Sequence, residues 1–257
     1  MIKIEPIKAF SDNYIWLVTT NEGLLVVDPG DSEPVDAYLT INKKQLSNIL
    51  ITHHHFDHTG GVKKLVNNSS LDVYGPTASI FDGINKELKD GDQVNIIGID
   101  FTIIEIPGHT LDHIAYFAEN DGEPFLFCGD TLFAGGCGRI FEGTYLQMYE
   151  SLNKLKKLPL NTKVYCGHEY TLANLTFALE VEHSNQALKD RYESCVNLRN
   201  NDQPTIPSLL ELEIQTNPFL RSDQKIIREC IMQKFDYKEE PGDIEIFKAV
   251  REWKDNT

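Results

Sequence analysis

Four of the chain's eight histidines lie within six residues, in the segment THHHFDH at residues 52–58. An apolar run leads into the segment and two glycines follow soon after it, so we expect a loop at the end of a buried strand. In extended backbone His53 and His55 point to one side and His54 to the other. Imidazole and carboxylate groups are good ligands for zinc-type ions, so the segment indicates a metal site rather than a solvated histidine-rich loop.

Three further segments have one form in common, an apolar strand that ends in a glycine followed by a potential metal ligand. Strand ends gather at one edge of a sheet in α/β proteins, so we expect these ligands to meet the histidine-rich segment. A two-metal site needs ligands for each ion, a bridging carboxylate and room for a shared hydroxide. The candidate ligands are His53, His55, Asp57, His58, His109, Asp130 and His168.

The pattern of the chain changes near residue 170. Before this point short apolar segments alternate with helical patterns, which favours a layered α/β architecture. The predicted strands are 14–19, 24–28, 48–52, 93–97, 101–106, 113–118 and 125–128, and the predicted helices are one capped by Ser32 and one at 145–158. Helical patterns follow at 171–183, 186–199, 208–215, 223–234 and 243–253. We therefore predict an α/β catalytic domain at 1–170 and a small helical domain at 171–257.

The charge balance limits the possible partners. The chain has 24 basic and 39 acidic residues, a formal net charge of −15, which argues against a nucleic-acid binder that relies on overall positive charge. An anionic ligand must therefore be held by a metal or by a local basic cluster. No stretch approaches the roughly 18 apolar residues of a membrane span. The five cysteines form no CxxC pair, which favours reduced thiols, and we expect a cytoplasmic monomer.

Several motifs together resemble a known family. The segments THHHFDH, PGHT, CGDTLF and GHEYT occur in the order typical of the metallo-β-lactamase superfamily. Within it, the segments FSDNYIW, GCGRIFEGT, NPFLR and AVREWK resemble the glyoxalase II (hydroxyacylglutathione hydrolase) family, and the likeness spans almost the whole chain. The resemblance implies a four-layer αββα sandwich followed by a small all-helical C-terminal domain that forms part of the substrate site.

The resemblance also implies how the ligands are shared between two divalent ions. His53, His55 and His109 would hold one ion, Asp57, His58 and His168 would hold the other, and Asp130 would bridge them. Asp57 would in addition orient the bridging hydroxide. Zinc is the favoured ion, and iron and manganese stay open because the same ligands accept them. His113 closes a motif that commonly reads HTxGH, and Asp112 stands here in place of its glycine.

Further residues are expected around the ions and the substrate. Asp28 ends an apolar strand, and it is either a turn residue or a partner that fixes a ligand histidine; His113 is a second candidate for such a role. The family's glutathione contacts match Arg139, Phe141, Tyr170, Arg251 and Lys254, with Phe141 standing where some members have tyrosine. Taken without the resemblance, Arg251 and Lys254 would be the solvated cationic end of a helix.

The activity implied by the resemblance is hydrolysis of S-D-lactoylglutathione to D-lactate and glutathione, the second step of methylglyoxal detoxification. A metal-bridging hydroxide would attack the thioester carbonyl. One alternative is a persulfide dioxygenase-like enzyme, which uses one iron held by two histidines and an aspartate. A metal-binding protein without catalysis is the other alternative. The helical C-terminal third, with NPFLR and AVREWK, favours the hydrolase.

Overall fold

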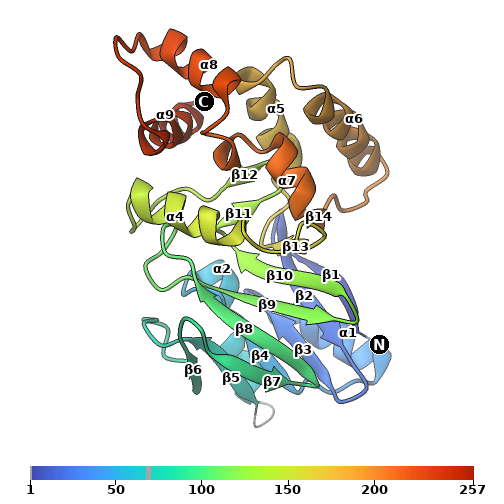
Figure 1. Ribbon diagram of the computed structural model, residues 1–257. Coiled ribbons are helices and arrows are strands. Elements are labelled where there is room, and N and C mark those ends of the chain that lie inside the picture. Colours follow the sequence, from blue (N-terminus) through green and yellow to red (C-terminus); the bar gives the residue numbers. More distant parts are fainter. Residues whose placement is uncertain (1, 68–70) are drawn as a thin grey trace.

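The computed structural model describes residues 2–67 and 71–257, and within them most strands belong to two six-stranded sheets (Figure 1). The first sheet consists, in spatial order, of β1 (Lys3–Ala9), β2 (Asn13–Thr19), β3 (Leu24–Val27), β4 (Asn48–Leu50), β5 (Asp72–Pro76) and β6 (Lys86–Leu88). The second consists of β14 (Ser208–Leu209), β13 (Lys163–Cys166), β10 (Glu123–Gly129), β9 (Ile114–Asn120), β8 (Ile99–Glu105) and β7 (Gln93–Ile96). A short pair, β11 (Leu132–Phe133) and β12 (Gly136–Cys137), follows β10.

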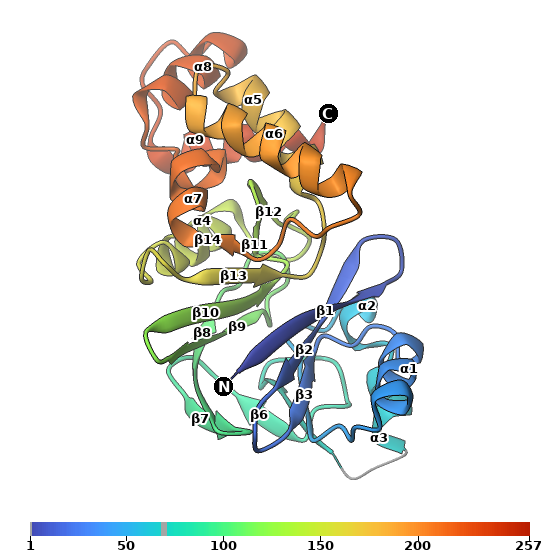
Figure 2. The ribbon, with the colours of Figure 1, turned by 90° about the vertical axis from the view of Figure 1, so that its right-hand side faces the viewer.

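The two sheets face each other, and helices cover the outer face of the first sheet (Figure 2). Successive strand residues point to opposite faces, so in β2 Trp16 and Val18 enter the core between the sheets, whereas Ile15 and Leu17 enter a second core. That second core also contains residues of α1 (Glu33–Asn42) and α3 (Val62–Asn67). On the far side, α4 (Tyr145–Leu155) packs against the second sheet. The predicted four-layer αββα sandwich is confirmed.

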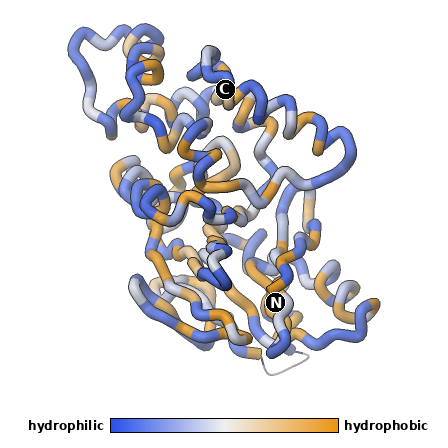
Figure 3. Tube along the Cα trace, turned by 45° about the vertical axis from the view of Figure 1, so that its right-hand side comes forward, coloured by the Kyte–Doolittle hydropathy of each residue, from blue (hydrophilic) through white to orange (hydrophobic). Residues whose placement is uncertain are grey.

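Helices make up most of the C-terminal third and lie beyond one end of the sheets (Figure 1). They are α5 (Thr171–Val181), α6 (Gln186–Asn200), α7 (Leu210–Thr216), the 3₁₀ turn η1 (Pro218–Leu220), α8 (Lys225–Phe235) and α9 (Asp243–Asp255). Hydrophilic and hydrophobic segments alternate along these helices, as expected when one face is packed and the other is solvated (Figure 3). In the part of the chain that the structure describes, no helix is long and apolar enough to cross a bilayer.

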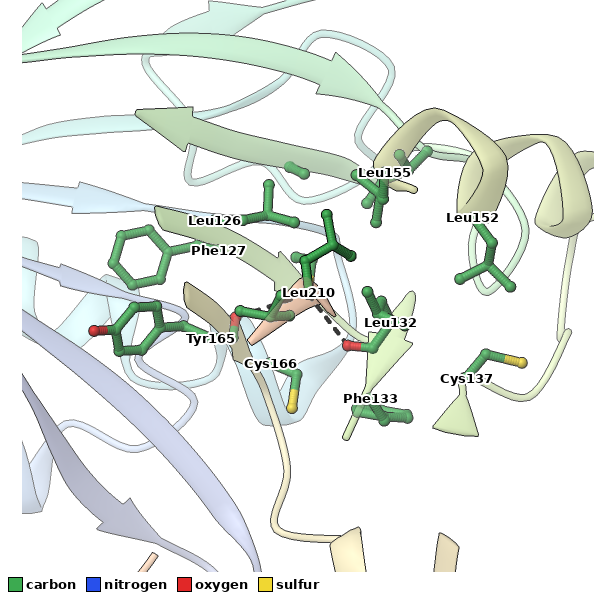
Figure 4. Close-up of a cluster of buried hydrophobic side chains, with 14 of the residues drawn as sticks. Leu126, Phe127, Leu132, Phe133, Cys137, Leu152, Leu155, Tyr165, Cys166 and Leu210 are labelled. Atoms are coloured by element: carbon green, nitrogen blue, oxygen red, sulfur yellow. Dashed lines mark hydrogen bonds between the residues drawn. The ribbon is translucent and has the colours of Figure 1, made fainter. Parts of the chain in front are cut away.

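Three local predictions about secondary structure are corrected by the structure. Residues 208–209 form strand β14 rather than the first turn of a helix, because they pair with β13 and the helix begins only at Leu210. Leu210 then packs among Leu126, Leu132 and Tyr165 (Figure 4). The helix predicted at 145–158 ends at Leu155. Ser32 makes no side-chain cap; Asp31 instead accepts a hydrogen bond from the backbone N–H of Glu33 at 2.9 Å.

The loop around β12 is fixed to the helices of the C-terminal third. Glu213 in α7 is fully buried, and it accepts the backbone N–H of Gly135 at 2.8 Å and pairs with Arg191 of α6. Asn217 donates its side-chain N–H to the carbonyl of Gly136 at 2.9 Å. Arg251 of α9 donates to the carbonyl of Cys137 at 2.9 Å. The segment that follows the candidate ligand Asp130 is therefore held by the C-terminal helices.

Candidate metal centre

The seven candidate ligands come from loops and one short helix at one end of the two sheets. His53 and His55 follow β4, and the chain then turns into the short helix α2 (Phe56–Thr59), which carries Asp57 and His58. The other three ligands stand just beyond three strands of the second sheet. His109 follows β8, Asp130 follows β10 and His168 follows β13. The structure thus brings together residues that are up to about half the chain apart in sequence.

The first ligand group consists of His53, His55 and His109. One ligand atom from each lies within 4.8 Å of the others. His109 Nε2 is 3.0 Å from His55 Nδ1, and the rings of His53 and His55 are 4.8 Å apart. Burial lowers the pKa of all three histidines, most strongly that of His53. Neutral imidazole is the form that binds a cation, so this environment suits metal ligation.

The second ligand group consists of Asp57, His58 and His168, which also offer ligand atoms within 4.8 Å of one another. His168 Nε2 is 3.3 Å from Asp57 Oδ2, and His58 Nε2 is 3.5 Å from the same oxygen. Burial opposes the charge on Asp57, but hydrogen bonding and charge from His168 and His58 hold the pKa of its carboxyl well below the usual range. Asp57 is therefore an anionic ligand candidate.

Asp130 lies between the two groups. Its Oδ2 is 3.6 Å from His109 Nε2 and 3.2 Å from His168 Nε2, and its Oδ1 is 3.4 Å from His58 Nε2. Burial opposes its charge, yet His58 and His168 hold the pKa of Asp130 well below the usual range. One carboxylate thus faces histidines of both groups, the arrangement that a bridging ligand requires.

Buried polar atoms without hydrogen-bond partners test whether these residues fit cations. In the described residues, His53 Nε2, His58 Nε2 and Asp130 Oδ1 are buried and have no partner. Such atoms are uncommon in proteins, since leaving them unpaired costs about 1–3 kcal/mol each. All three belong to candidate ligands, and imidazole nitrogen with carboxylate oxygen is a donor set that divalent cations accept. The residues therefore fit divalent metal ions.

Asp28 and His113 both contact the candidate ligands. Asp28 accepts the Nδ1–H of His58 at 3.0 Å, and it also accepts the backbone N–H and hydroxyl of Thr52 at 2.8 and 2.7 Å. It adopts a left-handed φ of 53°, which is uncommon for a residue other than glycine. His113 Nε2 accepts the backbone N–H of Asp130 at 3.0 Å. Of the two roles considered for Asp28, the structure favours the partner of a ligand histidine.

Two residues that contact ligands were missed by sequence reasoning. Asp12 Oδ1 lies 2.7 Å from His168 Nδ1, and Asn13 donates its Nδ2–H to Asp57 Oδ2 at 3.0 Å. Both stand in the segment FSDNYIW, which in the sequence serves only as a family signature. No local signal in the sequence points to their contacts, because Asn13 pairs with His168, which is far away along the chain.

A cavity of about 570 Å³ opens over the ligands. Its described lining residues are His55, Asp57, His109, Asp130, Phe133, Arg139, Phe141, His168 and Tyr170. Tyr170 stacks on His168 with ring centroids 4.6 Å apart, and Phe141 lies against His55 and His109 at 5.8 and 5.2 Å. The cavity therefore has a polar, metal-binding floor and aromatic walls.

The comparisons with known proteins agree with this geometry. The metallo-beta-lactamase superfamily model matches residues 10–168, and the model of the hydroxyacylglutathione hydrolase C-terminus matches residues 169–257. A hydroxyacylglutathione hydrolase of Pseudomonas paraeruginosa (strain DSM 24068 / PA7) is 48% identical over 258 residues, which cover 99% of each chain. The chain belongs to the hydroxyacylglutathione hydrolase family. The resemblance seen in the motifs is confirmed.

Other relatives and solved structures extend the comparison. The hydroxyacylglutathione hydrolase of Idiomarina loihiensis is 46% identical, over 99% of this chain and all of that one. The crystal structure of ETHE1 from Myxococcus xanthus has a TM-score of 0.64 at 22% identity and covers 98% of this chain and 96% of its own. That of BLEG-1 B3 metallo-beta-lactamase has a TM-score of 0.62 at 22% identity, over 86% and 99%. At this level of identity the two structures show only that this hydroxyacylglutathione hydrolase family chain has the same fold as they do.

Among the residues matched to the family's glutathione contacts, Arg251 and Lys254 lie deeper than the others. The described lining of the cavity includes Arg139, Phe141 and Tyr170, but not these two. Arg251 is only 3% exposed and its buried Nε has no partner, while Lys254 Nζ contacts the side-chain oxygen of Asn174. Burial lowers the pKa of Lys254 to about 8. The alternative of a solvated helix end is therefore wrong.

A first prediction tests which histidines of the segment 53–55 are metal ligands and which is not. It lies between the two carboxylates Asp112 and Glu142, with Nδ1 2.9 Å from Asp112 Oδ1 and Nε2 3.2 Å from Glu142 Oε1. We expect His54→Gln to keep the metal content of the wild type and His53→Gln to lose metal, as measured by elemental analysis of purified protein. Equal metal loss in both variants would show that His54 is a ligand too.

Proposed function

We propose that this protein hydrolyses the thioester of S-D-lactoylglutathione and related 2-hydroxyacyl-glutathiones, releasing glutathione and a 2-hydroxy acid. The observation that carries the proposal is one cavity whose floor contains ligands of both groups and whose wall contains Arg139, Phe141 and Tyr170. A reacting carbonyl and the glutathione portion of one substrate can therefore be held side by side. The relatives named hydroxyacylglutathione hydrolase support the same reaction.

We also propose that the site holds two divalent ions. His53, His55 and His109 would bind one, Asp57, His58 and His168 would bind the other, and Asp130 would be shared. Zinc fits this donor set best, and iron and manganese are also accepted by it. A related structure, that of TTHA1623, is described as di-iron-bound. A single iron held by two histidines and an aspartate would leave one ligand group unused, which argues against the dioxygenase alternative.

Bound ions would supply an activated water and would polarise the thioester carbonyl. The protein's own residues then have to position the reactants. Asp57 is a carboxylate at the cavity floor, and the hydrogen bond from Asn13 to its Oδ2 leaves Oδ1 to orient the attacking water. The leaving group is a thiolate, which departs without a strong general acid. Nucleophilic Ser or Cys chemistry is not required.

The glutathione portion would lie along the wall of the cavity and towards α9. Arg139 would pair with a carboxylate of the peptide, and Tyr170 and Phe141 would pack against its backbone. Lys254 and Arg251 would supply further positive charge, since a protein of net charge −15 needs a local cationic cluster to hold an anion. We place the boundary between the catalytic and substrate-binding domains at 170/171.

We further propose that the enzyme works as a cytoplasmic monomer on a small molecule, with no nucleic-acid or membrane partner. The net charge of −15 supports the absence of a nucleic-acid partner, because such a surface repels phosphate. All five cysteines lie in the described part of the chain and all are free thiols, as in a reducing compartment.

The proposed function is tested by a thioesterase assay on purified protein with S-D-lactoylglutathione. We expect turnover that needs no oxygen, falls when the protein is dialysed against a chelator, and returns when zinc is added back. The matched control is a thioester that lacks the glycyl carboxylate, which should be turned over poorly. Turnover that survives complete metal removal would contradict the metal-dependent reaction, and a requirement for oxygen would favour the dioxygenase.

A further inference from the structure

The segment 12–14 fixes the start of β2 to the loop that carries His168. The backbone N–H of Tyr14 donates to the carbonyl of Gly167 at 2.8 Å, and that of Glu169 donates to the carbonyl of Asp12 at 2.9 Å. Asn13 and His168 form an antiparallel bridge between these segments. Main-chain bonds thus hold the side chains of Asp12 and Asn13 at a fixed place beside the second ligand group.

Both side chains then reach ligands of that group, from which they are distant in sequence. Asp12 accepts the Nδ1–H of His168 at 2.7 Å, which leaves Nε2 facing Asp57 and Asp130. Asn13 is buried and donates to Asp57 Oδ2 at 3.0 Å. Asp57 comes after β4 of the first sheet, and His168 comes after β13 of the second. Asp12 and Asn13 therefore connect ligands that are supplied by the two different sheets.

The partners of the histidines differ between the two groups. In the second group each histidine gives its other ring N–H to a carboxylate, His58 to Asp28 and His168 to Asp12. Two histidines of the first group have neutral partners instead: His109 Nδ1 faces the carbonyl of Arg139 at 2.7 Å. The Nδ1 of His53 lies 3.0 Å from the hydroxyl of Thr52. A carboxylate partner fixes the tautomer and strengthens the ligand, so the second group depends more on its supporting residues.

We propose that Asp12 and Asn13 are positioning residues that set the metal affinity of the second ligand group and leave that of the first unchanged. The inference rests on the proposed metal centre. Asp12 orients His168, and Asn13 orients Asp57 by occupying one carboxylate oxygen. Loss of such a partner typically weakens metal binding by about 10- to 100-fold.

The test is competition for zinc between the loaded protein and a chromophoric chelator, which gives one dissociation constant for each ion. We expect Asp12→Asn and Asn13→Ala each to weaken one constant by roughly 10- to 100-fold and to leave the other unchanged. The matched control is Tyr14→Phe, which removes a hydrogen bond to Glu169 in the same segment but touches no ligand. It should leave both constants unchanged.

A double variant assigns the weakened constant to the second group. His168→Ala already damages that group, so adding Asp12→Asn to it should cause no further loss. Unchanged constants in both single variants, or equal weakening of both constants, would overturn the inference. Wild-type protein that binds no zinc would instead refute the proposed metal centre. Because the readout is metal binding, the inference can hold or fail independently of the hydrolase assay.

Discussion

Replacing Asp130 by alanine should remove metal and activity together. Asp130 faces His58, His109 and His168 at 3.2 to 3.6 Å, so its loss affects both ligand groups. It also removes a negative charge that would offset the charge of two bound cations. Partners of metal ligands alone contribute about 10- to 100-fold in affinity, and a shared ligand should contribute more than ~100-fold. Elemental analysis and turnover of S-D-lactoylglutathione on the same preparation measure both effects.

The control for this variant is Asp100→Ala, which replaces an exposed aspartate of β8 whose described side-chain contact is with Asn95. It should keep wild-type metal content and rate. An Asp130→Ala protein that retained two ions and a normal rate would refute the shared-ligand assignment. If it lost only one ion, Asp130 would belong to one group instead of bridging both.

The ligand positions could be predicted from the sequence because metal-binding residue types occur at the positions where strands end. Each candidate ligand follows an apolar segment, and strands of a layered α/β protein end at a common edge. Asp12 and Asn13 follow no such rule. Their role arises from pairing between the start of β2 and the His168 loop, which are about 155 residues apart in sequence. Contacts of this kind depend on tertiary structure and leave no local pattern.

The dependence on tertiary contacts also explains the errors in the predicted secondary structure. Residues 208–209 have the composition of a helix start, but they pair with β13 after the chain returns from the helices. Tertiary hydrogen bonding outweighs local preference in so short a segment. Arg251 likewise has the sequence context of an exposed helix end. Arg251 is buried because α9 packs against the loop at Cys137, a contact between segments that are far apart in sequence.

The second prediction with a large expected effect concerns Lys254, and it distinguishes a loss of substrate binding from a loss of catalytic rate. Lys254→Met keeps most of the apolar stem but removes the charged Nζ, which lies 5.6 Å from the centre of the Phe177 ring. A charge-assisted hydrogen bond contributes about 1.5–3 kcal/mol, so its loss should raise KM by roughly 10- to 150-fold. The kcat and the metal content should stay near wild type, because Lys254 is not a candidate ligand.

The matched control is Lys248→Met on the same helix. Lys248 is half exposed and pairs with Glu252, so the same substitution there should leave KM unchanged. A substrate that lacks the glycyl carboxylate should show no difference between Lys254→Met and wild type. If Lys254→Met handled S-D-lactoylglutathione as wild type does, the proposed glutathione contacts would reduce to Arg139, Phe141, Tyr170 and Arg251.

The pH dependence of KM gives an independent test of the same charge. Burial and the neighbouring Arg251 lower the pKa of Lys254 to about 8 in the free enzyme. Lys254 is therefore charged below that pH and becomes neutral as the pH rises through it, so binding of an anionic substrate should weaken above about pH 8. In Lys254→Met this rise in KM should disappear, because no charge is left to lose at that position. A rise of equal size in both proteins would assign the titration to another group, and a flat profile in wild type would show that Lys254 does not bind the substrate through its charge.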